Sequence, residues 1–420
     1  MGSTVESIVV MQELPAIALV AEDVSLRMGP DAARAFHYFR GLRARGLDVH
    51  LVTRELHRAE ICQHLAGEEE RIHGVPDPAS ALWVGRLGLL LPRRARGLTD
   101  VARSLISQRA QRRRVSQLVR RKGVRIVHQV TPAAPRAPSR IRELGVPVVM
   151  GPLLEVPQAP PGFSEPVSRT QHALDLALGV AQRLLQRVLG GRRRADVLLV
   201  ANAQSSRAVP AGARGRKLRL ASDGIDLSEW KPRDPAPASE VPEFLFVGRL
   251  SRDSGADLLL DAFRLTLDAC PGRLRIIGDG PLAAPLRRRC EELDLGQHVA
   301  WSGWLPPQTL RESIAAADAL VFPALRSAGA PVLMQAMASG LPVVATDWGA
   351  PADIASDGAG LLVGPRTRQQ FTNELASVMH RLAESPALRR ELGERALHHA
   401  RSEFDWNERL DRLLDVYRLV

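Results

Sequence analysis

The sequence predicts an α/β protein in which two Rossmann-like domains, each a doubly wound parallel sheet, face one another across a cleft. Short apolar segments alternate with helical segments along most of the chain, as in parallel strands joined by crossover helices. A proline-rich segment at residues 231–242 interrupts this alternation once. The chain has 420 residues, which is more than one hydrophobic core normally holds. These three observations together predict two domains.

The first domain is expected over residues 14–230. Its strands are predicted where short apolar runs occur, at residues 16–21, 47–53, 124–128, 146–150 and 197–201. Phe36, Phe39 and Leu42 follow the first run at helical spacing, and Gly46 is expected to end that helix. A strand, a helix and a strand in this order form the unit from which parallel sheets are built.

The second domain is expected over residues 243–400, after a linker at residues 231–242. Apolar runs again alternate with helical or loop segments, and they predict strands at residues 244–247, 274–277, 299–302, 319–322, 343–346 and 360–363. Residues 404–420 carry apolar side chains at helical spacing. They predict a last helix, within a C-terminal segment at residues 401–420.

The composition argues against several classes of protein. No apolar run reaches the roughly 18 residues that a membrane-spanning helix needs. The first residues have neither the basic start nor the long apolar stretch of a signal peptide. Cys62, Cys270 and Cys290 are odd in number and widely spaced, which favours neither a disulfide framework nor a metal site. We therefore expect a cytoplasmic protein without a bound metal.

Net positive charge is concentrated in one segment. The chain has a net charge of +11, and residues 93–125 hold eleven arginines and one lysine against one acid. Apolar residues in this segment recur at helical spacing, which predicts a basic amphipathic helix. One interpretation is the solvated face of a packed helix, and the other is peripheral binding to an anionic membrane surface. Nucleic acid is not expected as a partner, because no interleaved aromatic residues or known reader motif accompany the arginines.

The most informative segment is residues 322–353. Its pattern predicts a strand, a glycine-containing loop, a helix and another buried strand. Ser327 and Gly329 precede a helix that is predicted to begin near Pro331. Backbone N–H groups of such a loop, together with the positive end of the helix, form a binding site for phosphate.

The same segment strongly resembles the donor-sugar loop of glycosyltransferase family 4, the retaining transferases with the GT-B fold. The resemblance is carried by Ala336-Met337-Ala338-Ser339-Gly340-Leu341-Pro342-Val343-Val344-Ala345. Further motifs follow the order and spacing of that family: Val247-Gly248-Arg249-Leu250, Ile277-Gly278-Asp279-Gly280-Pro281 and Trp304-Leu305-Pro306.

The resemblance implies a fold, an activity and partners. The fold is GT-B, in which the last helix returns to pack on the first domain. The activity is transfer of a hexose from a nucleotide sugar to a glycan or lipid-linked acceptor, with retention of configuration and without a metal ion or other cofactor. The basic segment at residues 93–125 would suit such an acceptor at the cytoplasmic face of a membrane.

The resemblance also implies which residues form the site. The donor would be bound by Gly29, Gly248, Arg249, Arg252, Gly280, Leu305, Arg326, Ser327, Gly329 and Gln335. Among these residues, Arg249 would hold the diphosphate and the backbone at Leu305 would read the base. His128, at the end of a predicted strand, would face the reaction centre as a catalytic residue.

Three positions lack the charged residues of the family pattern and leave rival interpretations open. Ser254 stands where the family has a lysine that holds the diphosphate, and Ser327 and Gln335 replace its two glutamates. One rival is a catalytically inactive GT-B scaffold or a partner subunit of an active transferase. The other is a transferase with a remodelled site, in which Arg252 or Arg326 takes the place of the lysine.

Overall fold

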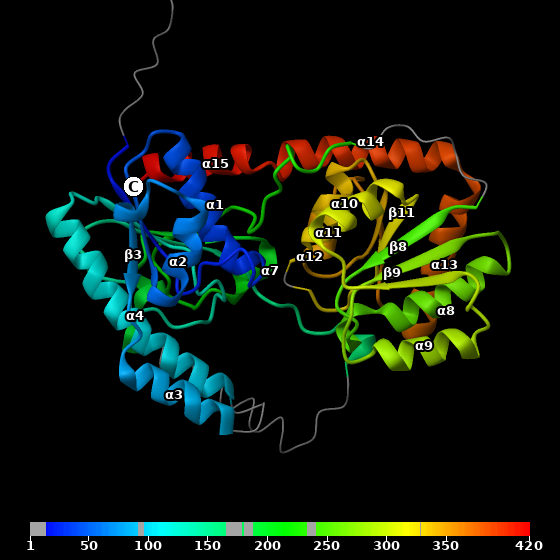
Figure 1. The fold of residues 1–420 in the computed structure, drawn as a ribbon, viewed down its shortest axis with the longest axis horizontal. Helices are drawn as coiled ribbons and strands as arrows, with labels where there is room; N and C mark the ends of the chain where they lie inside the picture. The colour runs from blue at the N-terminus through cyan, green and yellow to red at the C-terminus, as the bar shows by residue number, and fades with distance from the viewer. Residues whose placement is uncertain (1–13, 91–95, 165–178, 180–187, 233–240, 328) are drawn as a thin grey trace, which may run out of the picture.

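Two α/β domains lie side by side, each with one sheet between helices (Figure 1). The structure, a computed structural model, describes residues 14–90, 96–164, 179, 188–232, 241–327 and 329–420. Most of the linker predicted at residues 231–242 lies outside the described residues, as do Arg93 and Arg94 of the basic segment.

The first sheet has seven parallel strands in the order β3-β2-β1-β4-β5-β6-β7. Ile17 of β1 pairs with Val49 of β2 on one side and with Ile126 of β4 on the other. Every residue of these three strands is buried, as expected for a parallel sheet covered on both faces. The strands are β1 (Ile17–Val20), β2 (Val49–Arg54), β3 (Ile72–Val75), β4 (Ile126–Gln129), β5 (Val148–Leu153), β6 (Val197–Val200) and β7 (Arg216–Arg219).

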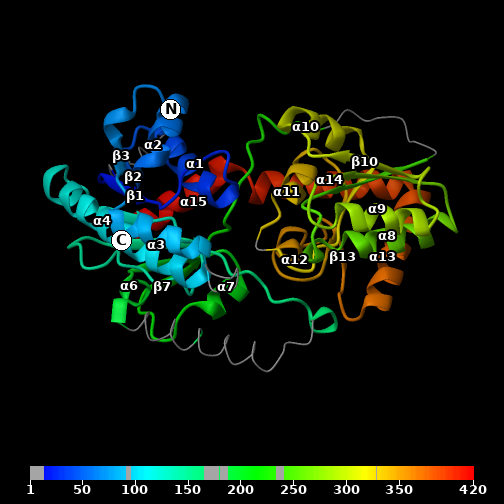
Figure 2. The same ribbon diagram turned by 60° about the horizontal axis from the view of Figure 1, so that its bottom comes forward.

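Helices join these strands and cover the first sheet. They are α1 (Pro30–Ala44), α2 (Glu55–His64), η1 (Glu69–Arg71), α3 (Ala79–Leu90), α4 (Arg96–Arg121), α6 (Gly191–Arg194) and α7 (Ala203–Ala208). The short helix η2 (Pro161–Phe163), between β5 and α6 in sequence, lies instead at the second domain. The pair formed by α3 and α4 lies at the outer side of the domain (Figure 2). The predicted basic amphipathic helix is therefore the longer member of a helical hairpin.

Helix α4 uses part of its positive charge within the domain. Its buried side packs against β1 and β2 and includes Leu105, Val115 and Leu118. Arg112 donates to the backbone oxygen of Arg142 at 3.1 Å, and Arg114 donates to Nδ1 of His73 at 2.9 Å. Arg113 is exposed. The arginines thus surround a packed helix, and only some of them face solvent.

The second sheet has six parallel strands in the order β10-β9-β8-β11-β12-β13. Leu320 of β11 pairs with Val343 of β12 on one side and with Leu245 of β8 on the other. The strands are β8 (Glu243–Val247), β9 (Arg273–Ile277), β10 (Val299–Gly303), β11 (Ala319–Phe322), β12 (Val343–Thr346) and β13 (Leu361–Val363).

The helices of the second half are η3 (Arg252–Ser254), α8 (Ala256–Leu267), α9 (Ala283–Glu292), α10 (Pro307–Ala316), α11 (Pro331–Ala338), α12 (Ala350–Ile354), α13 (Arg368–Glu384), α14 (Pro386–Glu403) and α15 (Trp406–Arg418). The core on one face of the sheet joins β8 and β9 to α8 and α13, and Phe244, Phe263 and Phe371 lie in it. On the other face, α11 and α14 supply the buried alanines Ala336, Ala338 and Ala396. Small residues let these helices lie close to the strands.

The predicted fold class of two parallel-sheet α/β domains is confirmed. The strand predictions missed β3 and β7, which are the two edge strands of the first sheet. β7 reads Arg-Lys-Leu-Arg and is largely exposed, and β3 contains Gly74. An edge strand pairs on one side only, so it needs no continuous apolar run that a sequence pattern would reveal.

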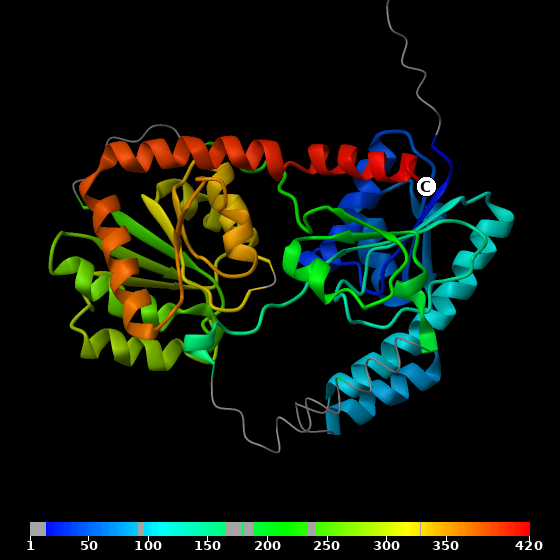
Figure 3. The same cartoon turned by 180° about the vertical axis from the view of Figure 1, so that it is seen from behind.

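Helix α15 lies on the first domain although it ends the chain (Figures 1 and 3). Leu410, Leu413 and Tyr417 belong to the same buried cluster as Ile17 of β1. A Cβ added to Gly41 of α1 would lie 2.2 Å from Cδ1 of Leu410, so the two helices approach closely at this glycine. Together α14 and α15 therefore join the two domains.

A second segment crosses in the opposite direction. Residues 154–164 follow β5 and reach the second domain, where η2 lies (Figure 3). The ring of Phe163 packs edge-on against that of Phe371, with centroids 6.0 Å apart. Nε1 of Trp348 donates to the backbone oxygen of Gln158 at 2.8 Å. The side chains of Phe163 and Trp348 thus hold the two domains together, in addition to the segments of chain that connect them.

Candidate functional site

Three strand ends meet at one edge of the second sheet, and a glycine stands at each. Gly248, after β8, donates its N–H to the oxygen of Ile277 at 3.0 Å, and Gly278, after β9, donates to the oxygen of Gly303 at 2.7 Å. Gly278 has a φ of +135°, and a Cβ there would lie 1.9 Å from the oxygen of Gly248. Only glycine permits this approach. Ligands of open parallel sheets bind at this carboxyl edge.

Two loops extend from the same edge. Gly280 lies in the turn after β9, where a Cβ would be 2.4 Å from the oxygen of Leu250. Leu305 follows β10 and is half-buried against the core. Next to it, the indole of Trp304 is 74% exposed. Trp304 was not among the residues expected in the site. A tryptophan directly after a strand-ending glycine is a signal that could have identified it.

The cations expected near the diphosphate lie in different surroundings. Arg249 is exposed at the end of β8, and its side chain has no hydrogen bond or ion pair with any described residue. Ser254, at the family's lysine position, donates from Oγ to the oxygen of Ser251 at 2.7 Å within a capping box of η3. Arg252 lines a different cavity, beside Phe163 and α9. Arg249 is therefore the cation best placed at the sheet edge.

Arg326 connects the two domains. Its Nε donates to the backbone oxygen of Pro157 at 3.2 Å, in the segment that crosses from the first domain. Its Nη1 lies 3.8 Å from Oδ2 of Asp253. The guanidinium of Arg326 is held between these two groups. It could therefore take over the role of the family's lysine at the diphosphate only if the crossing segment moved.

The loop after β11 and the helix that follows it contain Ser327 and Gln335, two of the polar residues expected to bind the donor. Ser327 donates from Oγ to the backbone oxygen of Gly329, so its hydroxyl is used inside the loop. Helix α11 begins at Pro331, directly after this loop. Gln335 lies on α11 and is half-buried. The helix start and the loop are therefore arranged as the sequence predicts.

The first domain contributes a glycine loop and a buried ionic network. Gly29 precedes α1 with a φ of +109°, which favours glycine. Arg34 of α1 is fully buried and donates to three oxygens: Ser222 O at 2.6 Å, Asp31 Oδ1 at 2.6 Å and Asp223 Oδ1 at 3.0 Å. The network ties the start of α1 to the segment after β7.

Asp223 brings the two domains together. A Cβ on Gly329 of the donor loop would lie 3.1 Å from Oδ2 of Asp223. The same oxygen accepts a hydrogen bond from the hydroxyl of Ser222 at 3.0 Å. Helix α1, through Arg34, and the loop at Gly329 therefore meet at one carboxylate. No sequence motif identified Asp223, because its partner Arg34 lies 189 positions away along the chain.

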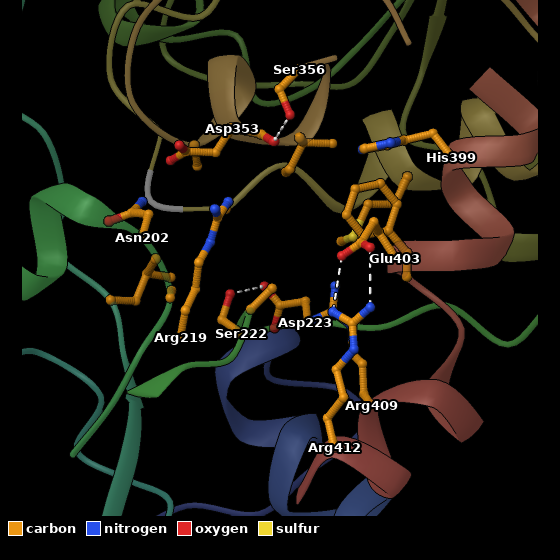
Figure 4. Close-up of a pocket in the computed structure, with 18 of the residues that line it drawn as sticks. Asn202, Arg219, Ser222, Asp223, Asp353, Ser356, His399, Glu403, Arg409 and Arg412 are labelled. Carbon is orange, nitrogen blue, oxygen red and sulfur yellow. Dashed lines mark hydrogen bonds and ion pairs between the residues drawn. The ribbon is translucent and has the colours of Figure 1, made fainter. Parts of the chain in front are cut away.

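A cavity of about 350 Å³ opens between the domains at this point (Figure 4). Asn202, Arg219 and Asp223 line it from the first domain, and Gly329 and Asp353 line it from the second. Helices α14 and α15 add the pair formed by Glu403 and Arg412, with N–O distances of 2.9 and 3.0 Å. Of the residues predicted to bind a donor, Gly329 is the one that lines this cavity.

Several groups in the cavity wall have shifted pKa values, and Arg409 and Asp353 are the two that matter here. Arg409 is 1% exposed, and burial lowers the pKa of its guanidinium to about 10. Its Nε and Nη2 have no hydrogen-bond partner among the described residues. Burial also raises the pKa of Asp353, while a hydrogen bond with Asn202 opposes the shift. The wall therefore combines a buried cation with unused donors and a carboxyl that resists ionisation.

His128 lies in the core rather than at the cleft, which corrects its prediction as a catalytic residue. The side chain is fully buried. Nε2 donates to the backbone oxygen of Gly151 at 2.8 Å, and the hydroxyl of Tyr417 donates to Nδ1 at 2.6 Å. Burial lowers the pKa of the imidazole to about 4. Both ring nitrogens are hydrogen-bonded, one to Tyr417 of α15 and the other to Gly151 of β5. The imidazole therefore has a structural role and no free nitrogen for a substrate.

Neither a metal site nor a membrane span is found in the described part of the chain. There, no three or more His, Cys, Asp or Glu side chains are grouped so that they could hold a metal ion. Among the same residues, no helix combines the length and the apolar character needed to cross a bilayer.

The second domain matches a known family. Residues 229–399 match the family model described as "Glycosyl transferases group 1". The match spans the whole second sheet. The chain is 30% identical over 279 residues to D-inositol 3-phosphate glycosyltransferase of Nocardia farcinica, covering 60% of this chain and 61% of that protein. The similarity thus spans about three fifths of that relative's length.

Solved structures share the whole two-domain fold. Sucrose-phosphate synthase from Thermosynechococcus elongatus superposes with a TM-score of 0.62 at 18% identity, covering 96% of this chain and 98% of that one. Anabaena HepE in complex with UDP gives a TM-score of 0.64 at 17% identity, covering 96% and 100%. At these identities the likeness establishes the fold, which is that of GT-B glycosyltransferases.

Proposed function

We propose that this protein is a glycosyltransferase that moves a hexose from a nucleotide sugar to a glycan or lipid-linked acceptor with retention of configuration. The observation that carries the proposal is the carboxyl edge of the second sheet. There, Gly248 and Gly278 bring backbone close to a ligand position, and Arg249 presents an exposed guanidinium without a partner among the described residues. A diphosphate is the anion that this combination suits.

The parts of the proposed site have separate roles. Arg249 would neutralise charge on the diphosphate as it leaves, and the N–H groups at the start of α11 would bind the same oxygens. The backbone at Leu305 would read the base, and Trp304 would stack on its face. Gln335 would accept from the ribose hydroxyls. In this proposal, neither a metal ion nor another cofactor takes part.

The acceptor would lie against the first domain, whose glycine loop at Gly29 would contact the phosphate of the donor. A lipid-linked or other anionic acceptor would suit the basic segment at residues 93–125, and that segment would meet an anionic membrane surface. The cytoplasmic location expected from the sequence belongs to the same proposal.

Calorimetry against UDP-, GDP- and TDP-sugars tests the proposal. At least one of them should bind in the micromolar range. Arg249→Ala should weaken that binding by about one to two orders of magnitude, because a charge-assisted hydrogen bond contributes about 1.5–3 kcal/mol. Arg273→Ala is the matched control, since Arg273 is an exposed arginine at the opposite end of the neighbouring strand β9.

Two outcomes would contradict the proposal. If no sugar nucleotide in the panel binds, the chain is better explained as a GT-B scaffold or a partner subunit, a role that suits the hydrogen bonds which occupy Ser254 and Ser327. If Arg249→Ala binds as tightly as the parent, the diphosphate does not lie at the end of β8. If a sugar nucleotide does bind, transfer of its labelled sugar to an acceptor distinguishes catalysis from binding alone.

A further inference from the structure

One segment of the chain is attached to both domains. We call residues 154–164 the crossing segment. At its start, the N–H of Leu154 donates to the backbone oxygen of Ala133 at 2.9 Å. The N–H of Glu155 donates to Oγ of Ser205 at 3.0 Å. Both partners belong to the first domain, whereas the rest of the segment lies against the second (Figure 3).

Glycines let the segment come close to the second domain. Gly162 is not in the left-handed region, so its backbone conformation does not require glycine. A Cβ there would overlap the backbone oxygen of Arg366, and this close approach does require it. On the other side of the contact, a Cβ on Gly349 would lie 2.7 Å from Cγ of Pro157. Together with the aromatic contacts described above, these approaches fit the segment to the second domain.

The crossing segment holds a side chain of the loop after β11. Nε of Arg326 donates to the backbone oxygen of Pro157 at 3.2 Å, and its Nη1 lies 3.8 Å from Oδ2 of Asp253. The N–H of Arg326 also donates to the backbone oxygen of Asp253, at 3.4 Å. Asp253 directly precedes Ser254, the family's lysine position. Arg326 therefore lies beside that position, with its guanidinium bound to the crossing segment.

The Nε–H of Arg326 cannot serve the segment and a diphosphate at the same time. A hydrogen bond from a guanidinium to a phosphate oxygen is roughly twice as strong as one between neutral groups. A bound diphosphate therefore offers Arg326 a better acceptor than the oxygen of Pro157. Reaching it requires the contacts of the segment to break, and that requirement lowers the apparent affinity for the ligand.

We propose that the crossing segment regulates the donor site: it restrains Arg326 in the unliganded protein, and its release lets Arg326 bind the diphosphate of a sugar nucleotide. This inference rests on the proposed function and adds a control to it. Donor binding and attachment of the segment then oppose each other by the same free energy. Because the segment starts on the first domain, a shift of that domain is transmitted to the donor site.

Calorimetry of segment variants with UDP-, GDP- and TDP-glucose tests the proposal. Trp348→Phe keeps an aromatic ring and removes the hydrogen bond to Gln158. It should raise the affinity for the sugar nucleotide that binds by about two- to tenfold, because one neutral hydrogen bond no longer holds the segment. Trp83→Phe is the matched control, since Trp83 lies on α3 of the first domain and is 66% exposed.

The gain should depend on Arg326. In the Trp348→Phe background, Arg326→Gln should remove the gain, whereas Arg326→Lys should keep part of it because lysine retains the charge. Phe163→Ala weakens the segment through a different contact, the edge-on packing against Phe371, and should change the affinity in the same direction. The melting temperature of each variant shows whether it is folded.

Hydrogen exchange gives a readout that does not depend on affinity. Saturating sugar nucleotide should increase amide exchange in peptides from residues 155–164 of the parent, because the segment detaches as the donor binds. A segment with only a structural role would keep its exchange rate or become more protected.

Three results would overturn the proposal: parental affinity in both Trp348→Phe and Phe163→Ala, a gain that survives Arg326→Gln, or exchange in the crossing segment that sugar nucleotide leaves unchanged or reduces. All three are compatible with a parent that binds a sugar nucleotide, and they leave the proposed function intact. If neither the parent nor any variant binds a member of the panel, the proposed function fails and this inference fails with it.

Discussion

The two edges that face each other between the domains are built in different ways. On the second domain, the strand ends are held by backbone hydrogen bonds between neighbouring glycines, such as Gly278 to Gly303. On the first domain, the edge is held by the buried side chain of Arg34, which bonds to Ser222 and Asp223 almost two hundred residues away. A site made of local backbone is visible in sequence motifs, whereas one made of long-range side-chain contacts is not.

The comparison predicts the largest effect for Arg34→Met. The substitution leaves Asp223 without its buried ionic partner, and breaking such a pair costs about 3–5 kcal/mol. We expect a fall of that size in the free energy of unfolding, measured with denaturant. Arg40→Met is the control, because Arg40 lies on the same helix with its side chain 46% exposed and its contact to Asp226 is long, at 3.4 Å. Equal losses in both variants would show that burial of the pair does not matter.

Gly278→Ala tests the backbone-built edge. A methyl group would lie 1.9 Å from the oxygen of Gly248, at a φ of +135°. We expect a loss of about 3 kcal/mol in the free energy of unfolding, because clash and backbone strain add. Gly296→Ala should be nearly neutral, since no atom lies within 4 Å of its added Cβ. If Gly278→Ala folds with parental stability, the strand ends are not held as closely as described.

His128 makes stability depend on pH. Burial lowers its pKa from 6.5 to about 4, so between these values the unfolded chain binds a proton that the folded chain does not. Stability should therefore fall as the pH drops from 6.5 to 4, by up to about 3 kcal/mol from this residue. His128→Gln should reduce the slope of the free energy of unfolding in this window, and His37 and His73, whose pKa values are also lowered to about 4, should keep the rest of it. An unchanged slope would mean that the imidazole is not buried in its neutral form.

Trp304→Ala should have the smallest effect and should leave the fold unchanged. Stacking of an aromatic side chain on a base contributes about 1–3 kcal/mol, so nucleotide affinity in calorimetry should fall roughly 5- to 100-fold. Trp83→Ala is the matched control, because its indole is also exposed but lies on α3. Parental affinity in Trp304→Ala would place the base elsewhere on the sheet edge.

The sequence by itself determined the α/β class, the alternation of strands and helices in each domain and the loops at the carboxyl edge of the second sheet. The periodicity of apolar residues and the positions of glycines are local properties. They shape the backbone over a few residues, whatever the rest of the chain contacts. The tertiary structure alone decided the rest. It placed His128 under Tyr417, engaged Arg326 with Pro157 and joined Arg34 to Asp223. Each of these contacts depends on packing between segments that are distant in sequence, and no local pattern records which side chains will meet.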